Sequence, residues 1–398
     1  MSNNSPSLFI EINKSEYIFT VGEDDEQDNL KVIYKCIVPV QGIQNYKITD
    51  LSLVIADIKK NIYLIEQKLN HTFKETILII NNFNYSFINV TGFKKLNGSQ
   101  ILKENISYII NSIKTNIDET ESKKTILHIF NSKYLLDKKK IENLPIGLFG
   151  DFYSHELSFC LINNNDYKNL INILNKCNIK TKKILIKGFV EGSFISNQNE
   201  NLDTFIQIKI GEKESQILYF ENDSLKFEQK FDFGANLIIN DISKITSLKV
   251  DIIKKIINNA KLNSDILKNE LIENEFFKNE NYVKIKKKLI LEIAEARIQE
   301  LAEIMITKNI NLSGYLKKDL VIFFTIINQS HFKFFKDSYK FFFSKNDDLS
   351  LKFMNIITTD DLINHAYKIA HYGWKKEAIP ITNIKKSLIA KVFHLIFG

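Results

Sequence analysis

The segment Leu8-Phe-Ile-Glu-Ile12, followed closely by Tyr17-Ile-Phe-Thr-Val21, decides the fold of the first part of the chain. Both segments are rich in β-branched and aromatic residues, and the polar Asn13-Lys14-Ser15 between them predicts a hairpin turn. A third strand is predicted at 31–38. Apolar residues then recur at helical spacing over 50–70. Three strands followed by a helix indicate an α/β layer.

The second half of the chain repeats this plan. Strands are predicted at 204–210, 215–220 and 224–231, with a turn between the first two, and isoleucines at helical spacing follow over 240–259. The two halves share this order without sequence identity. Such a repetition resembles the actin/Hsp70 superfamily, in which two related domains flank a nucleotide cleft. We therefore predict an α/β, two-lobed, actin/Hsp70-like fold with duplicated mixed sheets.

Composition limits what the chain can be. Its 398 residues are 44% hydrophobic and 25% charged, which is ordinary for a globular protein with a substantial core. The densest apolar run, 320–327, is far too short to span a bilayer, and the first residues show no signal peptide. The net charge of +7 favours anionic partners without choosing between nucleic acid and lipid.

Residue spacing indicates neither a metal site nor a catalytic site. The three cysteines lie far apart and the seven histidines show no ligand-type pairing, so no bound metal and no catalytic residue is predicted. The run 332–343 interleaves lysines with aromatic residues, as single-strand nucleic-acid binders do. A core-facing helix or strand with solvated lysines explains this run more simply. We therefore predict no nucleic-acid partner.

Several segments, taken in chain order, resemble FtsA, the actin-like bacterial division protein that works with the division tubulin FtsZ. The ordered set covers almost the whole chain. PilM-type pilus scaffolds share the fold and the inserted subdomain and are the nearest alternative. The segments that carry the resemblance are Gly42–Asp50, Ile126–Asp137, Leu144–Gly150, Asn169–Cys177, Phe233–Ile242 and Ala296–Leu301.

The resemblance also implies how the chain is divided. An α+β subdomain of the SHS2 type is expected at 76–163, inserted into the first lobe. The remaining parts are expected at 1–75 and 164–185 for the first lobe, 186–240 and 307–378 for the core of the second lobe, 241–306 for its small subdomain, and 379–398 for a linker and an amphipathic helix.

Two hairpins would carry the nucleotide chemistry of such a fold. Actin-like proteins hold the phosphates between Gly/Ser/Thr hairpins, because backbone N–H groups must approach the phosphate oxygens. Here the first hairpin reads Glu11-Ile-Asn-Lys-Ser15, which keeps a carboxylate and a hydroxyl but has lost the glycine. The second, Lys209-Ile-Gly-Glu-Lys-Glu-Ser-Gln216, lacks both expected aspartates. Its glutamates would repel phosphate, although Lys209 and Lys213 could offset them.

A third loop that normally passes close to the adenosine matches Thr325-Ile-Ile-Asn328, where two isoleucines replace glycines and would fill the ligand's space. An Ala-Glu pair that would contact the ribose becomes Ile253-Lys254. We expect no ATP hydrolysis, and the sequence favours loss of tight ATP and Mg²⁺ binding while leaving residual ATP binding open. The degenerate nucleotide-site positions are Lys14, Ser15, Gly211, Lys213, Gly234, Asp241, Lys254, Thr325 and Asn328.

The segment 384–397 predicts a helix that lies in the plane of a membrane. Its apolar residues recur at i, i+4, i+5 and i+8, and lysines flank the apolar stripe. The alternative is a terminal helix folded back on the core. The predicted membrane contacts are Ile384, Lys385, Lys386, Leu388, Ile389, Val392, Phe393, Ile396 and Phe397.

Together these features predict a scaffold and not an enzyme. The resemblance implies a peripheral protein on the cytoplasmic face of the inner membrane at the division site. It would assemble head to tail with itself, bind anionic lipid, tether FtsZ filaments and contact other division proteins. FtsZ capture is expected on the small subdomain, through basic residues such as Lys254, Lys255, Lys284, Lys286, Lys287 and Lys288. The alternatives are a functional actin-like ATPase of the same fold and a PilM-like pilus-assembly scaffold.

Overall fold

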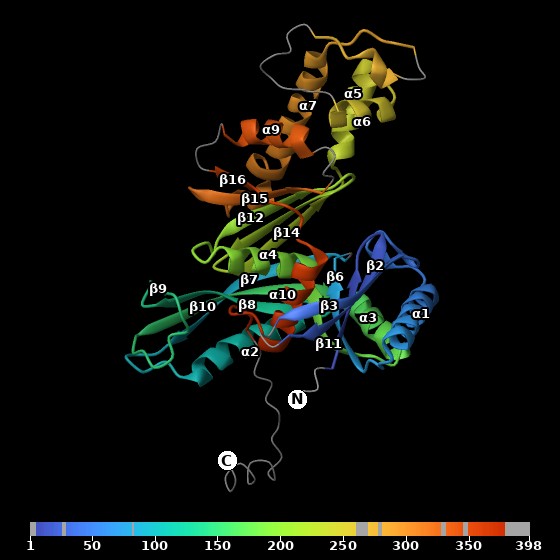
Figure 1. The fold of residues 1–398 in the computed structure, drawn as a ribbon. Helices are drawn as coiled ribbons and strands as arrows, with labels where there is room; N and C mark the ends of the chain where they lie inside the picture. The colour runs from blue at the N-terminus through green and yellow to red at the C-terminus, as the bar shows by residue number, and fades with distance from the viewer. Residues whose placement is uncertain are drawn as a thin grey trace. The chain divides into compact units, whose positions relative to one another are not determined.

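The computed structural model describes residues 5–25, 29–81, 83–259, 270–277, 281–327, 332–344 and 349–378. They form two units, and Figure 1 labels many of their elements. Unit 1 contains the described residues up to Lys187 and those from Ile363 onward, and unit 2 is Gly188–Leu362. Each unit holds a five-stranded mixed sheet with its own hydrophobic core.

The sheet of unit 1 has the strand order β11-β6-β1-β2-β3. Its strands are β1 (Ser7–Ile12), β2 (Glu16–Asp24), β3 (Leu30–Pro39), β6 (Glu75–Ile80) and β11 (Lys180–Ile186). The β1–β2 and β2–β3 pairs are antiparallel, whereas β1–β6 and β6–β11 are parallel. The predicted hairpin, third strand and helix are confirmed.

Two helices contribute to the core of this sheet, α1 (Leu51–Leu69) and α3 (Asn164–Lys176). The Asp50 side chain caps α1 by accepting a hydrogen bond from the backbone N–H of Leu53 at 3.0 Å. Asn70 ends the helix in the left-handed conformation. The buried stripe of α1 has the helical spacing seen in the sequence, and consists of Val54, Ile58, Asn61, Ile62 and Ile65.

The sheet of unit 2 repeats this topology strand for strand. Its order is β14-β13-β12-β15-β16, with the antiparallel pairs β12–β13 and β13–β14 and the parallel pairs β12–β15 and β15–β16. The duplicated mixed sheet is that of the actin-like fold, so the predicted fold class is confirmed. The strands are β12 (Phe205–Ile210), β13 (Ser215–Glu221), β14 (Ser224–Phe231), β15 (Leu320–Ile326) and β16 (Leu349–Phe353).

Unit 1 contains a second, four-stranded sheet in the order β7-β10-β8-β9. The helix α2 (Lys103–Thr120) lies in the core of this insert. The expected start of the insert at 76 is wrong, because β6 pairs with β1 in the first sheet. Its separate sheet begins only at Tyr85. The strands are β7 (Tyr85–Lys95), β8 (Lys124–Leu136), β9 (Lys139–Ile141) and β10 (Phe152–Asn163), and a short hairpin elsewhere in unit 1 comprises β4 (Ile43–Gln44) and β5 (Lys47–Ile48).

Helices dominate the rest of unit 2. The single helix expected over 240–259 is two helices, because Ser247 adopts a left-handed conformation between them. The aromatic run is a helix that buries Phe334, Phe335 and Tyr339, as its core-facing interpretation predicts. The elements are α5 (Ala235–Thr246), α6 (Val250–Asn259), η1 (Asn274–Phe277), α7 (Lys287–Ala302), η2 (Glu303–Thr307), α8 (Ile310–Ser313) and α9 (Phe332–Phe343).

The helix α10 (Thr359–Tyr372) and the residues after it return to unit 1 from Ile363 onward, although they were expected in the second lobe. Glu377 and the neighbouring residues attach there to β8. The N–H of Asn131 donates to the carbonyl of Lys376 at 2.6 Å, and the N–H of Ala378 donates to the carbonyl of Ile129 at 2.7 Å. We call residues 374–378 the C-terminal clasp.

The Glu377 carboxylate fixes this clasp. It lies 3.0 Å from Nδ1 of His128 on β8 and 2.6 Å from Nζ of Lys183 on β11. Burial alone would raise the pKa of Glu377, but the hydrogen bonds and charges of His128 and Lys183 outweigh it and lower the pKa to about 2. The carboxylate is therefore held in its charged form.

None of the helices that the structure describes is long and apolar enough to cross a membrane.

Candidate functional site

The two hairpins that were expected to hold a nucleotide occupy equivalent places in the two sheets. Each follows the first strand of its sheet: the N–H of Asn13 donates to the carbonyl of Glu16 at 3.0 Å, and the N–H of Gly211 donates to that of Glu214 at 2.9 Å. In each sheet the last residue of the first strand pairs with the last residue of the neighbouring parallel strand: Ile12 pairs with Ile80 on β6, and Ile210 pairs with Ile326 on β15. Glu11 and Lys209 therefore hold equivalent strand positions in the two sheets.

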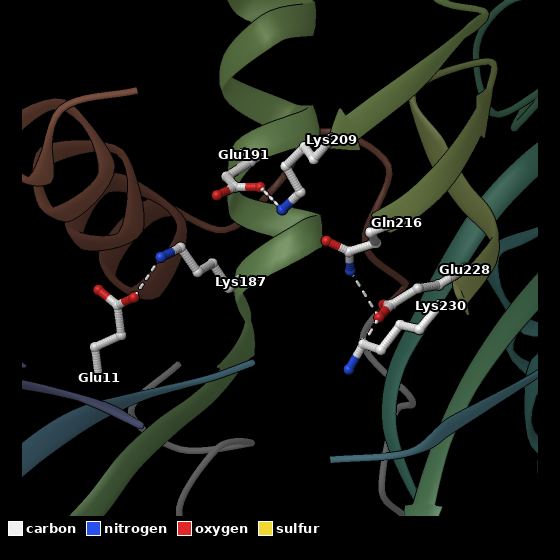
Figure 2. A network of polar contacts seen from close by, with 7 residues as sticks. All are labelled: Glu11, Lys187, Glu191, Lys209, Gln216, Glu228 and Lys230. Carbon is white, nitrogen blue, oxygen red and sulfur yellow. Dashed lines mark hydrogen bonds and ion pairs between the residues drawn. The ribbon is translucent and has the colours of Figure 1, made fainter. Parts of the chain in front are cut away.

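In unit 1, Glu11 is the penultimate residue of β1 and is almost completely buried, with 1% exposure. Its Oε1 accepts a hydrogen bond from Nζ of Lys187 at 2.5 Å (Figure 2). The two residues that follow Asn13 in the turn, Lys14 and Ser15, are exposed. The Lys14 ammonium lies over the ring of Tyr46, 5.1 Å from its centroid. The carboxylate that could serve a cation is thus neutralised by a lysine.

In unit 2, Lys209 holds the equivalent position, since it is the penultimate residue of β12. Its Nζ lies 2.5 Å from Oε2 of Glu191, on the helix α4 (Lys187–Gln198), and both side chains are about nine-tenths buried (Figure 2). A lysine here replaces the aspartate expected in an ATP-binding hairpin. The equivalent strand positions therefore carry opposite charges, and each is paired.

Two glycines bring Glu191 close to the sheet of unit 2. A Cβ at Gly188 would lie 2.6 Å from the Leu218 side chain, and one at Gly192 would lie 2.0 Å from the Phe220 ring. Both partners are on β13, so α4 can approach the sheet only without side chains at these two positions. The sequence analysis missed α4, because mid-helix glycines disfavour a helix.

A row of polar side chains crosses the same sheet beside Lys209. Gln216 is its register partner on β13, and Lys230 is that of Gln216 on β14. Gln216 Nε2 donates to Glu228 Oε1 at 2.8 Å, and Lys230 Nζ lies 3.5 Å from the same oxygen (Figure 2). Burial lowers the pKa of Lys230, while the Glu228 carboxylate opposes that shift.

The second hairpin is closed by the start of α5. The N–H of Ala235 donates to the carbonyl of Gly211 at 2.9 Å, and the N–H of Asn236 donates to that of Glu212 at 2.8 Å. These are N–H groups that a helix N-terminus would otherwise offer to a phosphate. A Cβ at Gly234 would lie 2.3 Å from the Gly211 oxygen, so this closure requires glycine there.

The third predicted loop lies next to this hairpin. Thr325 is buried on β15 and pairs in register with Lys209. The N–H of Ile327 donates to the carbonyl of Ile210 at 2.8 Å, and its Cδ1 would lie 3.6 Å from a Cβ at Gly211. An isoleucine side chain therefore stands beside the glycine that remains. Asn328 lies outside the described residues.

Two of the other predicted nucleotide residues, Asp241 and Lys254, lie on helices of unit 2 and not in the hairpins. Asp241 on α5 forms an ion pair with Nε of Arg297 on α7, and Nη1 of Arg297 lies 2.6 Å from Oε2 of Glu300. Lys213 is exposed in the hairpin turn, and Lys254 is half-buried on α6. Asp241 is thus a partner of Arg297 and not part of the hairpin contacts.

Asp241 and Arg297 line a shallow groove of about 460 Å³ between α5 and α7, which we call the α5–α7 groove. Its apolar members are Ile245, Ile293 and Ala296, and the Ile245 side chain is 61% exposed. Two of the segments that carry the family resemblance, Phe233–Ile242 and Ala296–Leu301, converge here. The remaining lining residues are Lys244, Glu292 and Glu300.

Sequence reasoning missed the partners Lys187, Glu191 and Glu377. The available signal was the charge reversal at two equivalent strand positions, Glu11 and Lys209, since a buried charge demands an opposite one nearby. The predicted membrane contacts between Ile384 and Phe397 lie outside the described residues.

Comparison with known proteins gives the same family as the motifs. The chain is 23% identical over 314 residues to the cell division protein FtsA of Buchnera aphidicola subsp. Schizaphis graminum, which covers 78% of this chain and 74% of that protein. It is 26% identical over 248 residues to FtsA of Buchnera aphidicola subsp. Baizongia pistaciae, and the match covers 62% of this chain and 58% of that protein. No protein-family model matches.

Two solved structures are similar at low sequence identity. One is the PilM-PilN type IV pilus biogenesis complex, with a TM-score of 0.49 and 8% identity over 92% of this chain and 96% of that chain. The other is MreB5 of Spiroplasma citri bound to ADP, with a TM-score of 0.45 and 10% identity. The match covers 92% of this chain and 96% of that chain. Together with the ordered motifs, the similarity to these FtsA relatives supports a divergent FtsA.

Proposed function

We propose that this protein is a cell division scaffold that tethers FtsZ to the cytoplasmic face of the inner membrane without turning over ATP. The observation that carries the proposal is the pair of self-neutralised hairpins. Glu11 and Lys209 occupy the two strand positions where Mg²⁺-serving carboxylates would stand, and each is bonded to an opposite charge of its own unit. Neither half needs a metal or a polyanion to balance its buried charge.

The backbone N–H groups at the start of α5 support the proposal as well, because they already donate to carbonyls of the hairpin. A phosphate would have to displace the hairpin carbonyls of Gly211 and Glu212 from those donors. Isothermal titration with ATP and Mg²⁺ is expected to give no heat of binding. A saturable binding isotherm together with ATP hydrolysis would establish the ATPase alternative instead.

The α5–α7 groove is the surface that we assign to FtsZ. It offers apolar contact with Ile245 and Ile293, which suits a short, mainly apolar peptide. Lys244 is the lining cation that could meet an acidic residue of that peptide, since Arg297 is paired with Asp241 and Glu300. The basic residues favoured in the sequence analysis contribute less clearly: Lys287 is buried and paired with Glu273 at 2.5 Å, so it is not available for an acidic peptide.

Co-sedimentation with FtsZ filaments tests the groove. Ile245→Glu is expected to reduce co-sedimentation at least tenfold, since it puts a charge on the apolar floor. Ile310→Glu is the matched control, because Ile310 is 86% exposed and lies outside the groove. Equal binding by the two variants would contradict the assignment.

Membrane attachment is assigned to residues 384–397. Removal of 384–398 is expected to abolish sedimentation with phosphatidylglycerol vesicles while leaving FtsZ binding in solution unchanged. A tail-less protein that sediments with vesicles as well as the full chain does would exclude this role.

A further inference from the structure

A cavity in unit 1 lies where β1, β6 and β11 begin. It measures about 610 Å³ and is lined by residues from the starts of these strands and by His371 at the end of α10. The hairpin of unit 1 follows the opposite end of β1, so this cavity is separate from that degenerate nucleotide hairpin. We call it the strand-start cavity.

Three lysines line the strand-start cavity: Lys74, Lys180 and Lys182. The backbone holds the first two together, since the N–H of Lys180 donates to the carbonyl of Lys74 at 2.9 Å. Both side chains are exposed, and within the described part of the chain no hydrogen bond or ion pair is found for either ammonium. The charge of these two ammonium groups is therefore not taken up by a bonded acid among the described residues.

The third lysine is held in place by its neighbours. Lys182 Nζ lies 3.2 Å from Oε1 of Glu75 and 2.7 Å from Nε2 of His371. His371 Nδ1 lies 3.1 Å from the carbonyl of Tyr367, so the imidazole donates through Nδ1 and accepts from Lys182 through Nε2. The cavity also contains Asp24, and its three lysines still outnumber its two acids.

The strand β11 connects this cavity to the root of the C-terminal tail. Lys182 and Lys183 are consecutive residues of the strand; Lys182 lines the cavity, and Lys183 binds Glu377 of the C-terminal clasp. The predicted membrane segment begins at residue 384, six residues beyond Ala378. Six residues span at most about 20 Å, so a membrane-bound tail would hold unit 1 close to the lipid surface.

We propose that the strand-start cavity binds a phosphate group through Lys74, Lys180 and Lys182, and that anionic lipid headgroups supply it. This inference rests on the proposed membrane attachment and adds a second, headgroup-specific contact on the body of the protein. Ammonium groups bind phosphate as point charges, and lysines near an anionic leaflet are worth on the order of a fivefold change in affinity each.

The test uses the full chain and vesicles of phosphatidylglycerol. Lys74→Ala with Lys180→Ala is expected to weaken vesicle binding roughly 20- to 30-fold, as two such lysines imply. The matched control is Lys59→Ala with Lys60→Ala, which removes the same charge from the exposed side of α1. Lys74→Arg with Lys180→Arg should retain binding. Equal weakening in the alanine pair and its control would overturn the proposal.

A second measurement separates the source of the phosphate. Inorganic phosphate should raise the thermal unfolding temperature of the full chain, but not that of the alanine pair, relative to chloride at equal ionic strength. If phosphate stabilises the protein while vesicle binding does not distinguish the pair from its control, the lipid source is overturned. If the full chain fails to bind vesicles at all, the membrane role itself fails, and the phosphate result still decides whether the cavity binds an anion.

Discussion

The two five-stranded sheets share one topology and differ in the charge next to each hairpin. In unit 1 the strand carries the acid, Glu11, and the partner is Lys187; in unit 2 the strand carries the base, Lys209, and the partner is Glu191. The partner residues also differ in exposure, because the Lys187 side chain is 21% exposed whereas the Glu191 side chain is 10% exposed. Duplication thus preserved the strand order but not the chemistry, and each half balances its own buried charge.

The largest expected effect comes from breaking the Lys209–Glu191 pair. Lys209→Met leaves the Glu191 carboxylate buried without its cation, which should lower the free energy of unfolding by about 3–5 kcal/mol. Urea unfolding measures it. Lys317→Met is the control in the same unit, since the Lys317–Glu221 pair is exposed on the lysine side and should cost less than about 1 kcal/mol. Similar losses of unfolding free energy in both variants would show that burial does not make the Lys209–Glu191 pair more important than the exposed one.

A pH series tests the charge that closes unit 1. Because the folded pKa of Glu377 is lowered to about 2, its contribution is present above the ordinary carboxyl pKa of about 4.3 and is lost as pH falls toward 2. The loss should be on the order of 3 kcal/mol. Glu377→Gln should flatten this part of the stability curve, measured by urea unfolding between pH 5 and pH 2. An unchanged slope in the variant would contradict the assignment.

The close packing of α4 against the sheet of unit 2 can be tested with a substitution that changes no charge. Gly192→Ala would push a methyl group against the Phe220 ring and should cost about 1–3 kcal/mol through overpacking. Gly314→Ala is the control, since no atom lies within 4 Å of a Cβ there and its backbone is helical. Thermal unfolding of both variants is the measurement. A neutral Gly192→Ala would mean that α4 does not need its close approach.

The smallest effect is expected from the Glu11–Lys187 pair, whose lysine is partly exposed. Glu11→Gln keeps a hydrogen-bond acceptor for Lys187, which can take up water once its charge partner is gone. A loss of about 1 kcal/mol is expected in urea unfolding. A loss as large as that of Lys209→Met would show that the two halves depend equally on their ion pairs.

Much of the fold could be predicted from local patterns. The strand triplets and α1 follow from alternation and helical spacing, which neighbouring residues determine. The start of the insert was misplaced because β6 has the same apolar character in either sheet, and only its pairing with β1 assigns it. Likewise α4 contradicts its own helix propensity, because contacts with Leu218 and Phe220 select its glycines.

The candidate site was predictable in register but not in its contacts. The losses at Asn13, Lys209 and Ile327 could be seen in the aligned motifs. The partners Lys187 and Glu191 could not, because an ion pair joins residues whose separation in sequence carries no periodic signal. Asp241 was assigned to the nucleotide by resemblance, whereas the structure pairs it with Arg297.

The return of residues 363–378 to unit 1 sets an order for synthesis on the ribosome. Unit 2 is continuous, so all of its strands have been made before the last part of unit 1 emerges. Until then the backbone of β8 lacks its hydrogen bonds to the C-terminal clasp, and His128 and Lys183 lack their partner Glu377. All residues of unit 2 are therefore available before unit 1 can be completed. Unit 1 can be completed only after residues 363–378 have been translated.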